Sequence, residues 1–120
     1  MSTTTSFDLE RFARAAEQRD ASTQLSMYGP DATVTIADKV SQPGSPRVLR
    51  THDEIKAWLE DVCARDMTHS VQRTVEDDSG VAFTEACCYP DGTTVLCATV
   101  IGLDGGLISE QTVVQVWDEK

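Results

Sequence analysis

The sequence predicts an α+β protein, with helices in the first half of the chain and an antiparallel sheet in the second half. Around residues 7–19 and after residue 51, apolar residues recur at intervals of three and four, the spacing of an amphipathic helix. From residue 68 onward the pattern changes to a period of two, which is typical of strands. The segments between these stretches are rich in Asp, Gly and Pro, the residues of tight turns.

The first half begins with a predicted helix over about Phe7–Arg19. Ser6 can cap this helix, and its apolar stripe consists of Leu9, Phe12, Ala13 and Ala16. A short second helix is expected over about Ser22–Tyr28, because Gly29-Pro30 is a strong stop signal. The β-branched residues of Ala32–Ile36 then predict a strand.

The third predicted helix begins with a capping box, Thr51-His-Asp-Glu54. In this motif the Thr51 hydroxyl accepts a hydrogen bond from the amide of Glu54, and the Glu54 carboxylate reaches back to the cap. The stripe behind it is the clearest amphipathic signal of the chain and consists of Ile55, Trp58, Leu59, Val62 and Cys63. Residues 39–50 before it contain two prolines and a glycine and are predicted to form a loop.

Four strands joined by short turns are predicted to form an antiparallel meander after the third helix. They are Thr68–Glu76, Val81–Tyr89, Thr94–Leu103 and Leu107–Trp117. Both faces of these strands carry apolar residues, as in Val95, Cys97 and Ile101 on one face and Leu96, Ala98 and Val100 on the other. One face therefore packs on the helices, and we expect a second copy of the protein to cover the other, forming a homodimer.

Length and charge narrow the classes of function. A chain of 120 residues favours one domain, expected over residues 7–120, after a flexible N-terminus over residues 1–6. Twenty acidic against ten basic residues give a net charge of −10, which disfavours nucleic acids and anionic membranes as partners. No apolar run approaches the roughly 20 residues that span a bilayer, and the N-terminus does not resemble a signal peptide. We therefore expect a cytoplasmic protein.

The four cysteines have no spacing typical of a metal site. Cys63, Cys87, Cys88 and Cys97 form no Cys-x-x-Cys pair, and the two histidines lie at no zinc-ligand distance from them along the chain. We therefore expect no metal ion, and buried free thiols that behave as small apolar side chains. A cross-strand pair of Cys87 with Cys97 is the alternative, which depends on a register that the sequence does not fix.

Several segments together resemble one protein family. They are Phe12–Asp20, Met27–Val34, Arg50–Leu59, Thr68–Val71 and Leu103–Ile108, followed by Val116-Trp-Asp118. In order and spacing they are similar to the SnoaL-like branch of the nuclear transport factor 2-like superfamily. The resemblance implies a cone-shaped α+β barrel, in which a curved, mainly antiparallel sheet wraps around the helices and leaves an apolar pocket. It also implies dimers formed through the sheet.

Members of this superfamily include steroid isomerases, dehydratases, polyketide cyclases and epoxide hydrolases, and also pocket proteins without demonstrated chemistry. Fold alone therefore does not give the function. A hand alignment with the steroid isomerases places Ile36 at their proton-shuttling aspartate, Phe12 at their oxyanion tyrosine and Thr99 near their second acid. Since none of these groups is preserved, we do not expect that mechanism.

His69 is the first candidate catalytic residue, because an imidazole can move protons near neutral pH. The resemblance places a histidine on this strand, facing the pocket, with a carboxylate near Glu17 opposite it. A Glu17–His69 pair would orient the ring and raise its basicity. The alternatives are a half-buried histidine bonded to the backbone and a solvated Glu17 beside Arg14.

Two further carboxylates complete the candidates. Asp38 follows the first predicted strand and could share its apolar face, and Glu85 lies between Phe83 and Cys87 on an alternating apolar face. A buried carboxylate has a raised pKa and can act as an acid, whereas an ion pair with Arg73 or Arg47 is the alternative. The residues expected to bind substrate are Phe12, Tyr28, Trp58, Phe83, Glu85 and Trp117.

The sequence thus predicts a SnoaL-like protein that performs acid–base chemistry without a cofactor on a small, apolar, oxygenated molecule. Dehydration, isomerisation and cyclisation are the expected reactions, with His69 as base, Glu17 as its orienting partner and Asp38 as a further acid. The alternative function is a non-catalytic ligand-binding or dimerisation module of the same fold.

Overall fold

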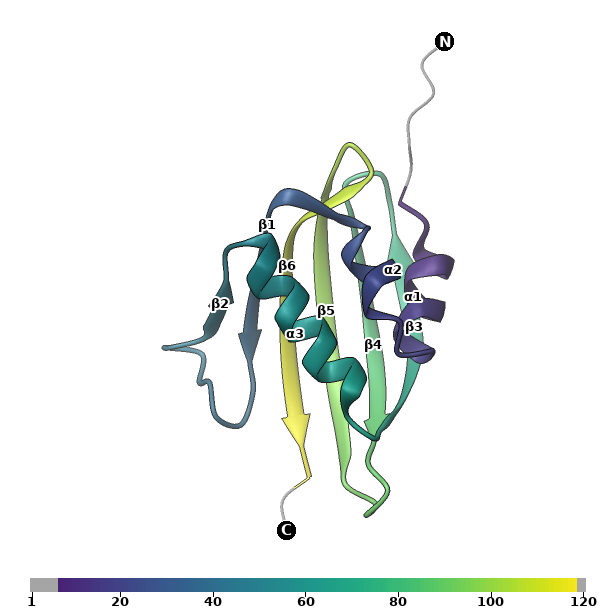
Figure 1. The fold of residues 1–120 in the computed structure, drawn as a ribbon, viewed down its shortest axis with the longest axis vertical. Coiled ribbons are helices and arrows are strands. Elements are labelled where there is room, and N and C mark those ends of the chain that lie inside the picture. The colour runs from purple at the N-terminus through teal and green to yellow at the C-terminus, as the bar shows by residue number, and fades with distance from the viewer. Residues whose placement is uncertain (1–6, 119–120) are drawn as a thin grey trace.

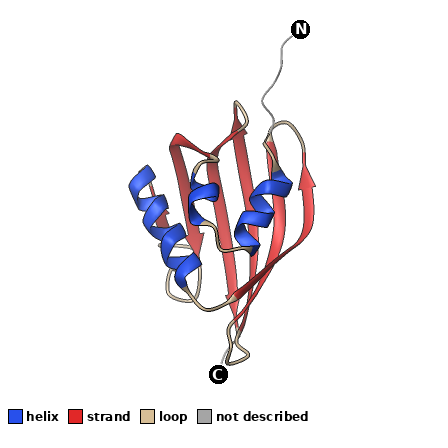
Figure 2. Cartoon of the chain, turned by 45° about the vertical axis from the view of Figure 1, so that its right-hand side comes forward, coloured by secondary structure: helices blue, strands red, loops and turns tan. Residues whose placement is uncertain are grey.

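A computed structural model describes residues 7–118 of the chain. The segment 1–6, for which we expected flexibility, lies outside the described residues. Over the described range, three helices lie on one face of a single six-stranded sheet (Figure 2). This arrangement confirms the predicted α+β fold, in which the sheet curves around the helices and stays open between its two edge strands.

The sheet contains the predicted meander, extended by two strands from the first half of the chain (Figure 1). From edge to edge the strands are β2 (Arg47–Leu49), β1 (Tyr28–Ala37), β6 (Leu107–Trp117), β5 (Thr94–Asp104), β4 (Gly80–Cys88) and β3 (Thr68–Glu76). Strands β1 and β6 run parallel, and every other neighbouring pair is antiparallel. The sheet is therefore mixed, with the parallel pair joining the two halves of the chain.

The three helices are capped by side chains of the chain itself. Helix α1 (Leu9–Glu17) is capped by Asp8, which accepts a hydrogen bond from the amide of Arg11. Ser6, the predicted cap, lies outside the described residues. Helix α2 (Ala21–Leu25) is capped in the same way by Asp20. Helix α3 (His52–Ala64) begins with the predicted capping box, in which both hydrogen bonds are formed.

Two predictions about the segment before α3 are wrong. Gly29-Pro30 does not end a helix but lies inside β1, at a register irregularity between Tyr28 and Thr33. Proline has no N–H for a regular ladder, and such an irregularity is where a strand can hold it. Residues 47–49, within the expected loop, form the edge strand β2, which pairs with β1.

The core lies between the helices and the inner face of the sheet. Val34 and Ile36 from β1 pack there with Ile55 from α3, Ile101 from β5 and Ile108 from β6, all nearly fully buried. The outer face carries the alternate residues of β5 and β6, and its apolar side chains Leu96, Val100, Val114 and Val116 are exposed. The two-faced pattern read from the sequence is thus present. That a second copy of the chain covers the outer face stays a prediction.

No helix within residues 7–118 is both long enough and apolar enough to cross a lipid bilayer.

Candidate active site

A cavity of about 80 Å³ lies between the helices and the inner face of the sheet. Apolar side chains from α1, α3 and the central strands form most of its wall. Its size allows several water molecules or a small ligand. The wall includes every residue expected to bind substrate, namely Phe12, Tyr28, Trp58, Phe83, Glu85 and Trp117.

The register of the sheet brings His69, Glu85 and Cys87 together on the wall of this cavity. His69 on β3 is the cross-strand partner of Cys87 on β4, and Glu85 lies two residues before Cys87 on the same face. The Nδ1 atom of His69 is 2.9 Å from a Glu85 carboxylate oxygen and 3.2 Å from the Cys87 sulfur. Three groups that can carry charge thus converge on one point of a mainly apolar cavity.

A second thiol adjoins this cluster. Cys97 on β5 is the cross-strand partner of Glu85 and forms a hydrogen bond with the thiol of Cys87. All four cysteines of the chain are free thiols, of which Cys87 and Cys97 are buried. The register that the sequence left open therefore places these two thiols in contact without a disulfide.

The cluster is buried, and its contacts favour a charged imidazole. The His69 side chain is 4% exposed and that of Glu85 is 16% exposed. Hydrogen bonds with Cys87 and with Glu85 raise the pKa of His69 to about 9, because they outweigh the effect of burial. At neutral pH His69 is therefore an imidazolium paired with Glu85.

The Cys87 thiol, unlike the His69 imidazole, is held in its neutral form. Its hydrogen bond with Cys97 and its burial raise its pKa well above the usual range of a thiol. Since the thiolate is the nucleophilic form, Cys87 is not an activated nucleophile in this state.

Within the described part of the chain, the second ring nitrogen of His69 has no partner. Nε2 is buried, and within residues 7–118 no hydrogen-bond partner reaches it. Buried polar atoms almost always have a partner in native proteins. This free donor thus belongs to a side chain that lines the cavity.

A buried polar pair lies elsewhere in the same wall, and sequence reasoning missed one of its members. The Tyr28 hydroxyl donates a hydrogen bond to the side-chain oxygen of Gln111 on β6. Burial raises the pKa of Tyr28 above its ordinary value, so the phenol stays neutral. The sequence pattern could have indicated Gln111, because it is a polar residue two positions before Val113 and therefore on the same inward face of β6.

The sequence of the chain matches the model of one known protein family. The model of the SnoaL-like domain family matches residues 9–111, which is most of the chain. The chain belongs to the SnoaL-like domain family. No curated protein matches its sequence.

Solved structures show how widely this SnoaL-like fold is shared. An NTF2-like protein of unknown function from Mesorhizobium loti superposes with a TM-score of 0.77 at 10% identity, over 90% of this chain and 87% of that one. A candidate ketosteroid isomerase from Kribbella flavida gives a TM-score of 0.71 at 14% identity, over 92% and 75%. A protein from Sphaerobacter thermophilus gives 0.70 at 21% identity, over 97% and 100%. At such identities the similarity establishes the fold and not a reaction.

Two of the carboxylates that the sequence suggested for this SnoaL-like site lie away from the cavity. Glu17 accepts a hydrogen bond from the backbone N–H of Val71 at 2.9 Å, because the end of α1 lies beside β3. Asp38 follows the end of β1 and accepts hydrogen bonds from the amides of Val40 and Ser41, which fixes a turn. The expected Glu17–His69 pair is therefore not formed, and Glu85 is the carboxylate that meets His69.

Proposed function

We propose that this SnoaL-like domain is an acid–base enzyme acting on a small, largely apolar molecule that carries a carbonyl or hydroxyl oxygen. The observation that carries the proposal is the His69–Glu85 pair, which leaves the second ring nitrogen of a cavity-lining side chain without a partner among residues 7–118. Dehydration, isomerisation or cyclisation of the substrate is the reaction class, and the chemistry rests on groups of the chain itself.

In this proposal His69 acts as an acid at the start of the reaction. Its Nδ1–H is held by Glu85, so the Nε2–H is the proton that can reach a substrate oxygen. In a dehydration, this proton passes to the leaving hydroxyl as the C–O bond breaks, and water departs. The neutral Nε2 can then accept a proton from the adjacent carbon, which restores the imidazolium as the double bond forms. His69 acts in turn as acid and as base, while Glu85 orients the ring and stabilises its charge.

Two enone-forming reactions test this proposal. A β,γ-unsaturated cyclic ketone and a β-hydroxy ketone each yield a conjugated enone, whose ultraviolet absorption reports isomerisation and dehydration, respectively. We expect turnover to fall by about 10²–10⁴-fold in His69→Gln, the usual contribution of a general acid–base group. Glu85→Gln should lower turnover less, and Glu17→Gln is the matched carboxylate control that retains it. Full activity in His69→Gln would exclude the mechanism.

A non-catalytic ligand-binding module is the second candidate, and one observation favours it. The positions aligned with the steroid-isomerase groups hold Ile36 and Phe12, which are buried in the apolar core. Both tryptophans of the chain, Trp58 and Trp117, line the cavity, so their fluorescence reports its occupancy. A fluorescence change on adding the same ketones, without enone formation, would support the binding module over the enzyme.

A further inference from the structure

We propose that His69, Glu85 and Cys87 form a binding site for a thiophilic divalent cation, with Zn²⁺ as the best fit. One imidazole nitrogen, one carboxylate oxygen and one sulfur lie within 4.8 Å of one another on the cavity wall. These are the three kinds of donor atom that zinc takes in proteins. The site goes beyond the proposed acid–base function and does not depend on it.

The spacing of the donor atoms suits a tetrahedral ion. A zinc ion with bonds of about 2.0–2.3 Å holds neighbouring ligand atoms roughly 3.3–3.6 Å apart. The observed separations are 2.9 Å from His69 Nδ1 to Glu85, 3.2 Å from His69 Nδ1 to Cys87 and 3.8 Å from Cys87 to Glu85. Each differs from the zinc range by less than about 0.5 Å, which small side-chain rotations can supply.

The surroundings supply rigidity and leave a fourth position open. The three side chains stand on neighbouring positions of β3 and β4, so sheet hydrogen bonding fixes their relative placement. Cys97, opposite Glu85 on β5, is not among the groups whose donor atoms lie within 4.8 Å of one another, so a water molecule or a ligand in the cavity would take the fourth position. A thiolate donor favours zinc over magnesium or calcium, and the net charge of −10 attracts cations to the protein.

The ligand pattern explains why the linear sequence gave no metal signal. Zinc ligands are usually recognised from short repeated spacings such as Cys-x-x-Cys. Here Glu85 and Cys87 are separated by one residue on one strand, and His69 reaches them only as a cross-strand partner. The site is therefore set by β-sheet register, which the chain does not display as a motif.

Metal binding and proton transfer compete at this site. A divalent ion takes the Nδ1 atom and the carboxylate oxygen that now share a proton, and it also displaces the proton of the Cys87 thiol. The ion thus replaces two protons, which pass to solvent. In the metal-bound form Glu85 no longer stabilises an imidazolium, so zinc would inhibit an acid–base reaction that depends on the His69–Glu85 pair.

Cobalt titration of the full-length, chelator-treated protein tests the site without any substrate. Co²⁺ substitutes for Zn²⁺ and reports a thiolate ligand by a sulfur-to-cobalt charge-transfer band. We expect one Co²⁺ per chain, displaced by one Zn²⁺. Cys87→Ser should abolish the band. His69→Gln should weaken binding by more than the roughly 10–100-fold that the loss of an outer-sphere partner costs.

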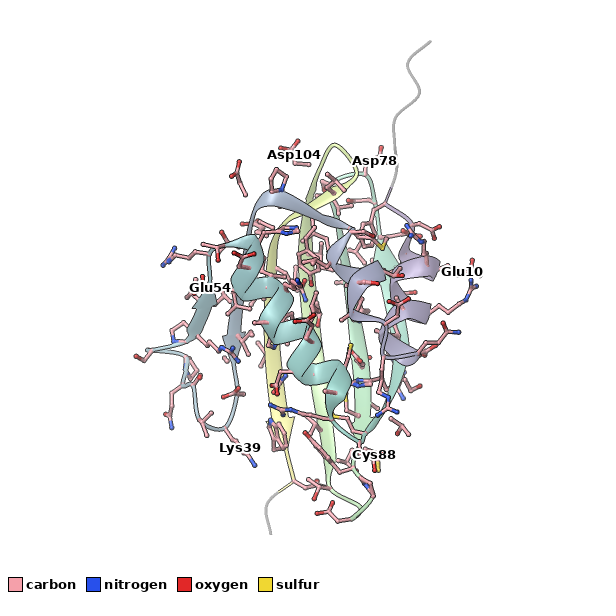
Figure 3. The ribbon with its side chains drawn as sticks, in the orientation of Figure 1. Glu10, Lys39, Glu54, Asp78, Cys88 and Asp104 are labelled. Carbon is pink, nitrogen blue, oxygen red and sulfur yellow. The ribbon has the colours of Figure 1, made fainter. Side chains whose placement is uncertain are left out.

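The controls are Cys88 and Cys63, two cysteines that are not among the proposed ligands. Cys88 is exposed at the end of β4, and Figure 3 shows it at the end of the sheet opposite to Asp78 and Asp104. Cys88→Ser and Cys63→Ser should therefore keep the band. A band that survives in Cys87→Ser but is lost in either control would overturn the proposal, as would a wild-type protein that binds no Co²⁺.

Circular dichroism separates loss of a ligand from loss of the fold. If Cys87→Ser does not fold, Glu85→Gln, which preserves shape, must weaken Co²⁺ binding for the site to stand. The measurement is independent of catalysis. Failure of the enone assays leaves the cobalt result intact, and failure to bind cobalt leaves the acid–base proposal intact.

Discussion

The two nitrogens of the His69 ring meet different surroundings, and one of them links the stability of the protein to pH. Hydrogen bonds with Cys87 and Glu85 hold the pKa of His69 at about 9, against 6.5 for the free side chain. A group whose pKa is raised by folding stabilises the native state fully below its unfolded pKa. This contribution is lost as pH rises through its folded pKa.

His69→Gln should therefore remove a pH-dependent part of the stability. The difference between the two pKa values corresponds to roughly 3 kcal/mol as an upper bound. We expect the free energy of unfolding of the wild type to exceed that of the variant most below about pH 6.5. The excess should shrink between about pH 6.5 and pH 9. Urea unfolding at several pH values, with a chelator present, measures it.

Other titratable groups face the same cavity, and the comparison of the wild type with His69→Gln has to account for them. They are Tyr28 on β1, Glu85 and Cys87 on β4, Tyr89 after β4, Cys97 on β5, Cys63 on α3 and Arg65 just after α3. Groups that do not contact His69 contribute equally to both proteins and cancel in the difference, whereas the hydrogen bonds of Glu85 and Cys87 with His69 are part of what the variant removes. A difference that stays constant from acid to alkaline pH would show that His69 does not titrate in this way.

The sequence identified His69 and Glu85 as candidates but not their contact. His69 stands 16 residues from Glu85 along the chain, and only the pairing of β3 with β4 places them together. A shift of one residue in that register would send one of them to the opposite face. Glu17 was chosen instead because the family resemblance places a carboxylate near its position, one residue after the apolar stripe of the first helix. The way α1 packs beside β3, which turns Glu17 toward Val71, is a tertiary property.

Among the elements, α3 has the start that local sequence specifies most completely, and it forms one wall of the cavity. The amide of Glu54 donates to the Thr51 hydroxyl at 3.1 Å, and the amide of Thr51 donates to the Glu54 carboxylate at 3.2 Å. Figure 3 shows Glu54 on this helix. The box satisfies amides that would otherwise lack partners within the helix.

Thr51→Ala should destabilise the protein by about 1 kcal/mol, the usual cost of losing such a cap. For a domain of this size, that loss corresponds to a fall in Tm of roughly 3–5 °C. Thermal unfolding measures it. Thr51→Ser, which keeps the hydroxyl, is the matched control and should stay close to the wild type. Equal Tm values for all three proteins would mean that the cap contributes nothing measurable.

Local sequence specified the meander well and the first two strands poorly. The turn between β5 and β6 shows why the meander was readable, since Gly105 and Gly106 adopt φ values of 61° and 81°. Positive φ at both central residues is the geometry of the type I′ hairpin turn, which this pair of glycines indicates directly. By contrast, β1 pairs in parallel with β6, about 80 residues later, and β2 has three residues. The strand over Ala32–Ile36, within β1, was predicted, but neither its parallel pairing with β6 nor a strand as short as β2 leaves a local signal.

Considered across the molecule, the sheet divides the chain into a covered face and an uncovered one. The helices lie on the inner face, and the outer face of β5 and β6 carries apolar side chains in register. Leu96 lies opposite Val116, and Ala98 lies opposite Val114. The exposed fractions are 49% for Leu96, 65% for Val116 and 45% for Val114. A contiguous apolar patch of this kind on a folded domain commonly marks an interface.

We propose that a second copy of the chain covers this patch, because the patch is apolar, exposed and available on every copy. Val114→Lys places a charge in its centre, where burial would cost more than the lost contact. Val40→Lys is the matched control, since Val40 is 80% exposed in the segment between β1 and β2. Sedimentation equilibrium should give twice the 13.1 kDa of one chain for the wild type and for Val40→Lys, and one chain for Val114→Lys. A wild type that sediments as a single chain, or a Val114→Lys variant that stays dimeric, would show that the outer face is not the contact between copies.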